Sequence, residues 1–384
     1  MKLMHLSDLH LGKRLNEFSL LEDQSFILQQ LVELVRSEQP DCVLLAGDIY
    51  DKPVPPAEAV TLFDDFLNKL AQLTTVCVTS GNHDSAERLA FGAQLMREGG
   101  VHFCGLYTGE PQCVTLQDTY GSVHIYLLPF LKPVHVRHCL PPTEAEQVTT
   151  YHEALRCAVE RLHINATERN VLVAHQFVTG AQTAGSEAVN VGGVDNIGAD
   201  VFADFDYTAL GHIHKAQNVG SERVRYSGTP LKYSFAEWQQ EKSVTLVELG
   251  EKGSVSVTAL PLAPLRDLRK LRGSYEELMS KDFYDELPKD SDGLLRDFYH
   301  LTLTDEEDVP DAVQKLRSVY KNLLQLEYDN KRTRTDNAIE GAARVVEKSP
   351  LELMEEFYQL QNNQALSEKQ RAYLQGLLEK EESR

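Results

Sequence analysis

The sequence predicts an α/β fold in which two packed sheets are flanked by helices. Three observations predict it: short apolar runs end in glycine or polar residues, helical periodicity separates the first runs, and some later runs alternate with period two. The chain has 384 residues, enough for two or three domains with a sizeable buried core. Hydrophobic residues make up 42% and charged residues 25% of the sequence, which is ordinary for globular proteins and argues against a largely disordered chain.

Three strands near the N-terminus are expected to alternate with two helices. The strands are expected at residues 3–6, 42–46 and 76–79, where apolar runs end in polar residues. Between the first two strands, apolar residues recur with the spacing of one helix face. The second helix is expected to begin near Pro55-Pro56, because proline suits the first turn of a helix. Strands joined in this way through helices are typical of a parallel sheet with helices packed outside.

Six further runs are expected to form strands and to complete a first domain over residues 1–262. They lie at residues 123–128, 171–174, 208–210, 224–227, 244–249 and 255–260. Glycine turns separate the last of them, which indicates that part of this group is antiparallel. These strands predict a second sheet packed on the first.

The composition changes near Pro261 and marks a second domain. Residues 266–272 hold four basic side chains, whereas residues 274–311 hold 13 acidic and 3 basic ones. Strands are expected at residues 298–303 and 324–328, with helical periodicity between them. The pattern predicts a small β-α-β domain over residues 263–330.

Residues 331–348 are polar and predict a linker, and residues 349–384 predict a helical tail. Ser349-Pro350 and Ser367 each have the features of a helix start, and the tail helices carry apolar stripes. Such a stripe must be buried, either on the chain's own body or on a partner. The sequence leaves both possibilities open.

The charge and cysteine content limit the class of protein. Thirty-eight basic against 58 acidic residues give a net charge of −20, which argues against unspecific wrapping of a polyanion. No apolar run approaches the roughly 20 residues that span a bilayer, and the N-terminus has no signal-peptide core. The six cysteines form no C-x-x-C pair, so we expect free thiols and a reducing cytoplasmic location.

Five short polar segments each follow the end of an apolar run. They are Asp8-x-His10, Gly47-Asp48-x-x-Asp51, Gly81-Asn82-His83-Asp84, His175 and Gly211-His212-x-His214. Each alone has an ordinary explanation, as a helix cap, a turn or a hydrogen-bonded histidine at a strand end. However, ligands gather at the carboxyl ends of strands in α/β sheets, because the loops converge there. The recurrence of such segments at successive strand ends therefore predicts a single site.

Seven of these side chains predict a centre with two metal ions. They offer two carboxylates, four imidazoles and one amide oxygen: Asp8, Asp48, His10, His175, His212, His214 and Asn82. Imidazole and carboxylate sets suit Mn, Fe or Zn, whereas Ca prefers oxygen alone and structural Zn prefers thiolates. Seven ligands exceed the need of one ion, and paired ions about 3.5–4 Å apart suit phosphoryl displacement. Two divalent ions carry +4 against −2 from the two aspartates, so the site can hold phosphate.

The five segments, in this order, resemble the calcineurin-like metallophosphoesterase superfamily, whose pattern is D-x-H, G-D-x-x-[DH], G-N-H-[DE], H and G-H-x-H. The resemblance is greatest to the SbcD family, because residues 5–12, 46–51, 80–84, 206–214 and 226–235 all read like that family. These segments cover roughly residues 1–250. The resemblance implies a metallophosphoesterase two-sheet sandwich, with residues 263–330 as a capping domain.

The resemblance also implies a role for each site residue. One ion would be held by Asp8, His10, Asp48 and His214, and the other by Asp48, Asn82, His175 and His212, with Asp48 bridging. His83 would stand beside the phosphate as a catalytic residue, and Asp84 would orient His83. Asp51 receives no firm role, because some relatives carry histidine at this position.

The function implied by the resemblance is a metal-dependent DNA phosphodiesterase that prefers manganese. It would be the nuclease subunit of an ATP-dependent double-strand exonuclease and hairpin endonuclease in DNA end processing, repair, recombination or replication. The implied partner is an SbcC-like coiled-coil ATPase, which the tail helices would bind, with two nuclease chains forming a homodimer within a heterotetramer. No G-x-x-x-x-G-K-[ST] motif occurs here, so ATP chemistry would come from the partner.

Two alternatives stay open at the level of the sequence. A metallophosphatase or cyclic-nucleotide phosphodiesterase could use the same dinuclear site, because one scaffold serves many phosphate esters. A non-catalytic DNA-binding scaffold is the third class. Residues 226–235 and the capped tail helices favour the DNA phosphodiesterase.

Overall fold

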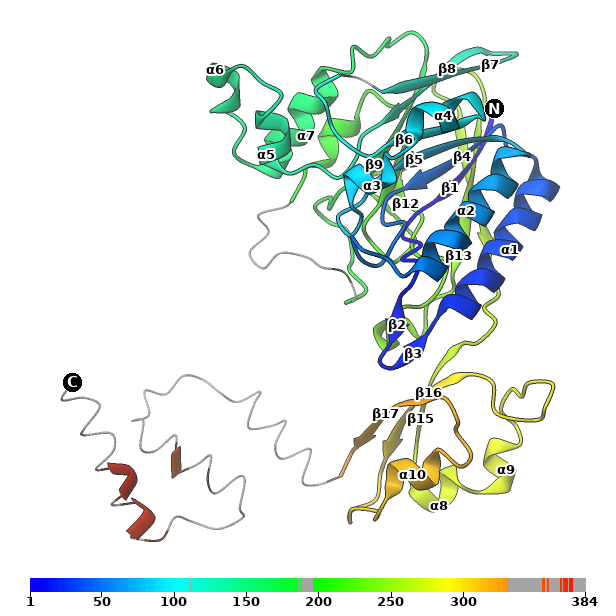
Figure 1. Ribbon diagram of the computed structural model, residues 1–384, viewed down its shortest axis with the longest axis vertical. Helices are drawn as coiled ribbons and strands as arrows, with labels where there is room; N and C mark the ends of the chain where they lie inside the picture. The colour runs from blue at the N-terminus through cyan, green and yellow to red at the C-terminus, as the bar shows by residue number, and fades with distance from the viewer. Residues whose placement is uncertain are drawn as a thin grey trace.

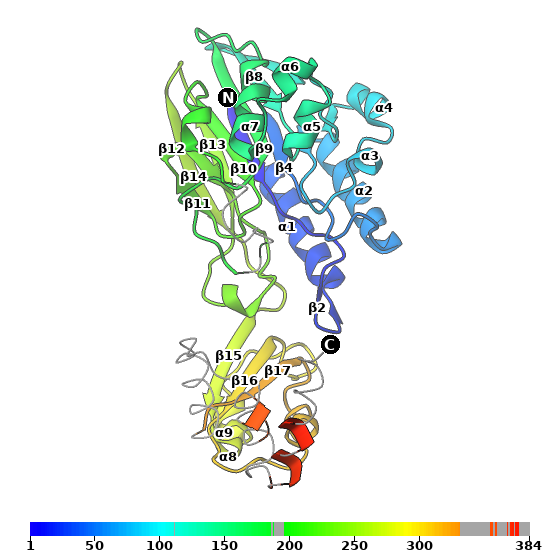
Figure 2. The ribbon, with the colours of Figure 1, turned by 90° about the vertical axis from the view of Figure 1, so that its left-hand side faces the viewer.

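The computed structural model describes residues 1–110, 112–185, 187 and 196–330, together with a few residues between 354 and 375. Two six-stranded sheets face each other, and helices cover the outer face of each sheet (Figure 1). A three-stranded sheet with short helices of its own lies beyond one end of this sandwich (Figure 2). The arrangement confirms the predicted α/β class with two packed sheets.

The first sheet is mostly parallel. In spatial order its strands are β14 (Val255–Pro261), β13 (Ser243–Leu249), β1 (Lys2–Leu6), β4 (Cys42–Ala46), β5 (Thr75–Thr79) and β6 (Val101–Cys104). Strands β1, β4, β5 and β6 are parallel to one another, and β13 and β14 join as antiparallel strands. Helices α1 (Leu21–Glu38) and α2 (Ala57–Ala71) cover its outer face. All five residues of β4 are buried, because both faces of this strand are covered.

The second sheet has parallel strands in its centre and an antiparallel strand at each edge. In spatial order its strands are β11 (Gln217–Val219), β12 (Ser221–Tyr226), β10 (Tyr207–Gly211), β9 (Arg169–His175), β8 (Gly121–Leu127) and β7 (Cys113–Asp118). Its outer face is covered by helices α5 (Pro133–Arg137) and α7 (Tyr151–Glu160), and the short helix α6 (Pro142–Ala145) lies beside α5. Between the sheets, fully buried Leu44 and Val171 belong to one apolar core.

Short elements complete this part of the chain and lie in the loops between the strands. They are β2 (Arg14–Leu15), β3 (Phe18–Ser19), α3 (Ala86–Leu89), α4 (Ala93–Glu98) and the 3₁₀ turns η1 (Ala199–Phe202) and η2 (Phe235–Glu237). The loops after β1, β4, β5, β9 and β10 reach the same edge of the sandwich, because side chains from all five contact one another there.

The small sheet consists of three parallel strands, β15 (Leu268–Gly273), β16 (Phe298–Leu303) and β17 (Leu323–Tyr328). Its helices are α8 (Tyr275–Leu278), α9 (Lys281–Tyr284) and α10 (Ala312–Leu316). The sequence predicted β16 and β17, but it missed β15, which has two arginines, one lysine and two leucines three residues apart, and therefore no apolar alternation. The helix predicted between these two strands is α10, a short helix that ends at Leu316.

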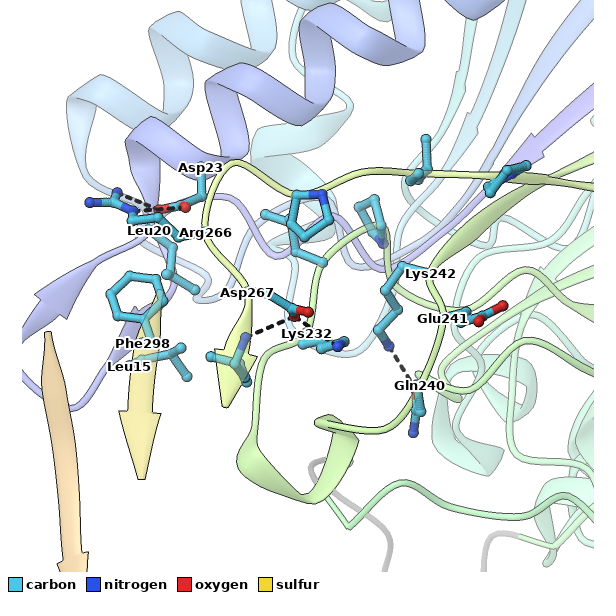
Figure 3. Close-up of a pocket in the computed structure, with 16 residues that line it drawn as sticks. Leu15, Leu20, Asp23, Lys232, Gln240, Glu241, Lys242, Arg266, Asp267 and Phe298 are labelled. Carbon is cyan, nitrogen blue, oxygen red and sulfur yellow. Dashed lines mark hydrogen bonds and ion pairs between the residues drawn. The ribbon is translucent and has the colours of Figure 1, made fainter. Parts of the chain in front are cut away.

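Ion pairs fix the small sheet to the sandwich. Both Arg266 Nε and Nη2 donate to the buried carboxylate of Asp23, at 3.0 and 2.6 Å, and Lys232 Nζ lies 2.7 Å from Asp267 Oδ1. A cavity of about 350 Å³ lies at this junction (Figure 3). Its lining includes Lys242 in addition to these four residues.

The predicted linker, residues 331–348, lies outside the described residues, as does most of the predicted tail, residues 349–384. One described contact agrees with the predicted start of the second tail helix: the backbone amide of Gln370 donates to Ser367 Oγ at 3.4 Å. Among the described residues, no helix is long and apolar enough to cross a bilayer.

Candidate metal centre

The five polar segments meet at one edge of the sandwich. Asp8 and His10 follow β1, Asp48 follows β4, and Asn82 follows β5. From the second sheet, His175 ends β9, and His212 and His214 follow β10. The structure therefore brings all seven predicted ligands from two sheets to one place, where six of them are buried and Asn82 is partly buried.

The backbone is shaped to aim these side chains inward. Asp8, His10, Asp48 and His212 all have positive φ angles, of 54°, 44°, 50° and 103°, which non-glycine residues rarely adopt. Hydrogen bonds between loops maintain the conformation: the Asp8 amide donates to Gly47 O and the His10 amide donates to Asp48 O, each at 3.0 Å. Such strained residues cluster at functional sites, where the surroundings stabilise them.

Two motif glycines are required by close packing at this edge. A Cβ atom on Gly47 would lie 2.3 Å from Nδ1 of His175, and one on Gly81 would lie 2.1 Å from Oδ1 of Asp48. Gly47 also has a φ of 79°, which favours glycine. The glycines of the G-D and G-N-H segments therefore make room for the site side chains of neighbouring strands.

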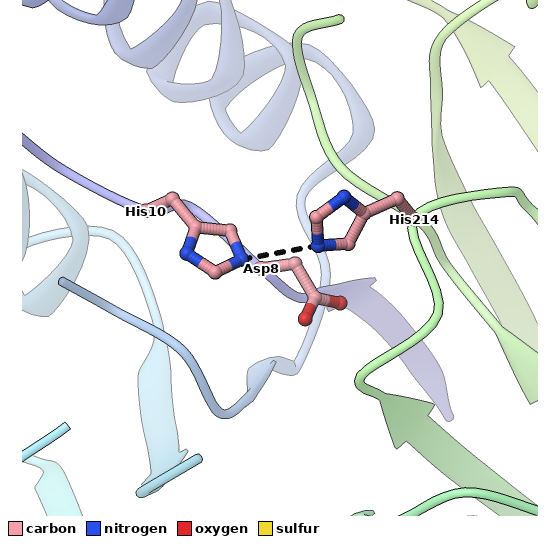
Figure 4. A group of neighbouring side chains, drawn as sticks. All are labelled: Asp8, His10 and His214. Atoms are coloured by element: carbon pink, nitrogen blue, oxygen red, sulfur yellow. Dashed lines mark hydrogen bonds between the residues drawn. The ribbon is translucent and has the colours of Figure 1, made fainter. Parts of the chain in front are cut away.

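Asp8, His10 and His214 form one group whose ligand atoms lie within 4.8 Å of one another (Figure 4). The two Nε2 atoms of His10 and His214 face each other at 3.1 Å. The Asp8 carboxylate is also held in place, because its Oδ1 accepts the backbone amide of His212 at 3.0 Å. These contacts come from β1 and β10, one strand of each sheet.

Asp48 stands between this group and the remaining ligands. Its Oδ2 lies 3.6 Å from His10 Nε2 and 3.4 Å from His175 Nε2. Asn82 Oδ1 lies 2.9 Å from both His175 Nε2 and His212 Nδ1. The carboxylate of Asp48 therefore lies between the two groups of predicted ligands.

The protonation of these groups fits a centre for divalent cations. Burial lowers the pKa of His10 well below its ordinary value and that of His212 to about 3, so both rings are neutral and offer lone pairs. Burial would raise the pKa of Asp48, but the neighbouring His175 and His10 outweigh it and keep that pKa far below its ordinary value. Nδ1 of buried His10 has no hydrogen-bond partner among the described residues. The neutral rings of His10 and His212 and the ionised carboxylate of Asp48 are donors that suit a cation.

His83 lies at the rim of this centre. Its amide donates to Asp48 Oδ1 at 2.8 Å, and its ring Nδ1 lies 2.9 Å from Asp51 O. The ring meets that of His10 edge to face, with centroids 4.8 Å apart. One His83 ring nitrogen also lies within 4.8 Å of ligand atoms of His10 and Asp48. His83 is therefore adjacent to the centre and oriented by a backbone carbonyl.

Asp84 has partners different from the one predicted. The sequence predicted that it orients His83, but its carboxylate accepts the backbone amides of Ile49, Tyr50 and Gly81, at 3.1, 2.9 and 2.9 Å. The prediction is corrected: Asp84 ties the loop after β5 to the loop after β4, and so holds Asp48 and His83 together only indirectly. Burial and then nearby Asp48 raise the pKa of Asp84 to about 6.

Comparison with known proteins agrees with this geometry. A family profile described as calcineurin-like phosphoesterase matches residues 1–216, and one described as Type 5 capsule protein repressor C-terminal domain matches residues 264–362. The SbcD subunit of nuclease SbcCD from Staphylococcus epidermidis is 31% identical over 334 residues, which cover 85% of each chain. The chain belongs to the SbcD family. The resemblance stated from the sequence is thereby confirmed, as is the metallophosphoesterase fold.

Two solved structures also match part of this SbcD-family chain. One is a dimetal phosphatase from Danio rerio, with 11% identity over 67% of this chain and 95% of that one, and a TM-score of 0.39. The other is TT1561 of Thermus thermophilus, with 12% identity over 67% of this chain and 98% of that one, and a TM-score of 0.37.

As a calcineurin-like phosphoesterase of the SbcD family, the chain is a metal-dependent hydrolase whose cofactors are divalent metal ions. When bound, such ions supply Lewis-acid activation of water and of phosphate oxygens. The protein's own contribution is to fix the ligands on strained, interlocked loops and to place His83 beside them. A histidine so placed can stabilise charge on a phosphate or transfer a proton to a leaving oxygen.

Sequence reasoning missed two residues that line this centre and gave no role to a third. The Tyr233 ring packs against His10 with centroids 5.6 Å apart, and its hydroxyl donates to Leu9 O. Glu237 lies 3.5 Å from His214. Asp51 lies 2.7 Å from Lys13 Nζ and 3.8 Å from His10 Nδ1. Asp51 belongs to the G-D-x-x-D segment, and Tyr233 belongs to the SbcD-like segment 226–235. No sequence pattern indicated Glu237.

Proposed function

We propose that this chain is the DNA-cleaving subunit of an SbcCD-type complex, a metal-dependent phosphodiesterase that opens hairpins and degrades double-stranded ends. The observation that carries the proposal is the convergence of seven ligand side chains from both sheets, with His83 beside them. The relative from Staphylococcus epidermidis is named as part of a nuclease. In the cell the complex would act in DNA repair, recombination and replication.

The metal centre is proposed to hold two manganese ions. One would be bound by Asp8, His10, Asp48 and His214, and the other by Asp48, Asn82, His175 and His212. The donor set supports this, because it mixes imidazole with oxygen ligands and contains no thiolate. His83 is proposed to act on the phosphate rather than on an ion.

The path of DNA is proposed to follow basic loops beside the centre. Basic residues lie shortly after three of the metal-binding segments: Lys13, Arg14, Lys52 and Arg88. The last three are exposed, whereas Lys13 is half-buried and pairs with Asp51 at 2.7 Å. Basic side chains in loops commonly contact the phosphate backbone and position a duplex. Ordinary solvated surface charges are the alternative explanation for these three residues.

The division into domains and the partners are part of the same proposal. Residues 1–262 would form the nuclease domain, 263–330 the capping domain, 331–348 a linker and 349–384 a tail that binds the SbcC-like ATPase. We also propose a homodimer. Its support is an exposed apolar face near α3 and α4, where Phe91 is 84% and Leu95 is 79% exposed. Sedimentation of the purified chain should give twice its 43.2 kDa mass, and a monomer at micromolar concentration would contradict the dimer.

A cytoplasmic location is proposed from the thiols. All six cysteines are free, and the Sγ atoms of buried Cys42 and Cys77 lie 3.7 Å apart without forming a disulfide. Free thiols in such proximity suit a reducing compartment. Fractionation of cells under conditions that preserve compartments would test the location.

Removal of metal is expected to abolish activity reversibly. Dialysis against EDTA should stop degradation of linear duplex DNA, and manganese should restore it more fully than magnesium or calcium, because imidazole ligands favour transition metals. The assay should include hairpin DNA and p-nitrophenyl phosphates in parallel. Turnover of the small esters alone would contradict a nuclease and favour a phosphatase, and no turnover of any substrate would favour a non-catalytic scaffold.

A further inference from the structure

A fully buried carboxylate lies directly behind one metal ligand. Glu237, in η2, has no exposed surface, and its Oε1 lies 3.5 Å from Nδ1 of His214. The opposite ring nitrogen of His214, Nε2, faces the centre, 3.1 Å from Nε2 of His10. The imidazole is thus held between a carboxylate on one side and the metal-binding group on the other.

Lys242 compensates the buried charge of Glu237. Its Nζ is 2.6 Å from Glu237 Oε2, and the side chain is 7% exposed. The same Nζ donates to Thr229 Oγ1 at 2.7 Å and to Gln240 Oε1 at 2.9 Å, the latter contact visible in Figure 3. A buried ion pair is stable only where further hydrogen bonds satisfy its polar atoms, as they do here. The pair is therefore an integral part of the site.

The pair also holds the main chain of His214. Lys242 Nζ donates to His214 O at 3.0 Å, and the Thr229 amide donates to the same oxygen at 3.1 Å. The His214 amide donates in turn to a second carboxylate, Oε1 of Glu187, at 3.0 Å. The ring of His214 therefore faces Glu237, while its backbone is fixed on both sides by hydrogen bonds.

We propose that Glu237 is a positioning residue that holds the His214 imidazole with its Nδ1 proton toward the carboxylate and its Nε2 lone pair toward the metal. Lys242 pairs with the Glu237 carboxylate and holds it in place. The inference rests on the two-ion centre proposed above. Carboxylates that orient ligand histidines raise ligand basicity, and their removal typically lowers metal affinity by about 10–100-fold.

The test is a manganese titration of the full-length chain, in which wild-type protein should bind two ions. Glu237→Gln keeps the shape of the side chain but removes its charge. It should weaken one manganese site by about 10–100-fold and leave the other within about twofold. Electron paramagnetic resonance should correspondingly lose the signature of a coupled manganese pair at concentrations that fill both wild-type sites.

A matched control separates positioning from general stability. Asp297→Asn also changes a fully buried carboxylate with a basic partner, Arg269, but in the small sheet. It should lower the melting temperature and leave both manganese sites unchanged. If Glu237→Gln does not fold, the double variant Glu237→Gln/Lys242→Met removes both buried charges and should show the same selective weakening.

The outcomes distinguish the inference from the function on which it rests. Wild-type affinity at both sites in the Glu237 variants would overturn the inference alone, as would equal weakening of both sites. If wild-type protein itself binds fewer than two manganese ions, the proposed centre is wrong.

Discussion

Replacing His83 with glutamine is expected to reduce DNA hydrolysis by about 10²–10⁴-fold, the usual contribution of a positioned acid or base. Both manganese sites should keep their affinity. The reason is geometric: ring Nδ1 is occupied by the carbonyl of Asp51 at 2.9 Å, which leaves the other ring nitrogen for the phosphate. Glutamine is similar in size and can form hydrogen bonds, but it cannot take up and release a proton.

The measurement is single-turnover degradation of linear duplex DNA at saturating manganese, paired with a manganese titration. His124→Gln is the control. His124 lies on β8, and its ring is hydrogen-bonded to Thr115 and Glu168. It pairs with Asn170 near the start of β9, whereas His175 ends that strand. It should retain wild-type activity. Because a ring nitrogen of His83 also lies within 4.8 Å of ligand atoms of His10 and Asp48, a ligand role is the competing explanation. Loss of a manganese site in His83→Gln would establish that role, and full activity would exclude any role in the reaction.

The sequence was most informative where a buried strand ran into a polar segment. The predicted bounds of β4, residues 42–46, agree with the structure, because an unbroken apolar run can be satisfied only by burial on both faces. The same strand ends placed Asp48, Asn82 and His175 correctly at one edge, since parallel strands carry their following loops to the same side. The order and residue types of these segments were therefore sufficient to predict which seven side chains meet, but not that Tyr233 and Glu237 lie beside them.

Contacts that depend on folding could not be predicted in this way. The Asp84 carboxylate accepts backbone amides up to 35 residues away, on a different loop. These partners do not include His83, the residue that precedes it in the sequence. Glu237 is 23 residues after His214 and belongs to no recognisable pattern, so only the path of the chain around β12 reveals it. Strand β15 was missed for a different reason, because its apolar and polar residues do not alternate and it is a strand through its pairing with β16.

The largest loss of activity is expected for Asp48→Asn, which should abolish hydrolysis. It should also weaken both manganese sites by more than about 100-fold, because loss of a residue that only orients a ligand typically lowers metal affinity by about 10–100-fold. Asp48 lies between His10 and His175, so its charge would serve both ions of the proposed centre. Asparagine preserves the shape and can still accept the His83 amide at Oδ1, so the loop geometry should survive. The main defect is therefore expected in metal binding, with the path of the loops unchanged.

Thermal unfolding with and without manganese measures this defect. An ion at about 100 times its dissociation constant stabilises the folded state by about 2.7 kcal/mol, so wild-type protein should melt at a higher temperature with metal. Burial lowers the pKa of His175, but the Asp48 carboxylate outweighs it and raises that pKa to about 9. This raised pKa stabilises the metal-free fold fully below pH 6.5, the ordinary value, and the stabilisation is lost as the pH rises through about 9. The variant should thus also melt earlier without metal near pH 7.

The diagnostic quantity is therefore the rise in melting temperature that manganese causes within each protein. Asp23→Asn is the matched control, because Asp23 is likewise buried and pairs with a cation, Arg266, at the domain junction. It should lower the melting temperature while the rise with manganese persists. For Asp48→Asn the rise should vanish. A variant that retained it, and still bound two ions, would mean that the ions are not joined through Asp48, and the bridging arrangement would have to be abandoned.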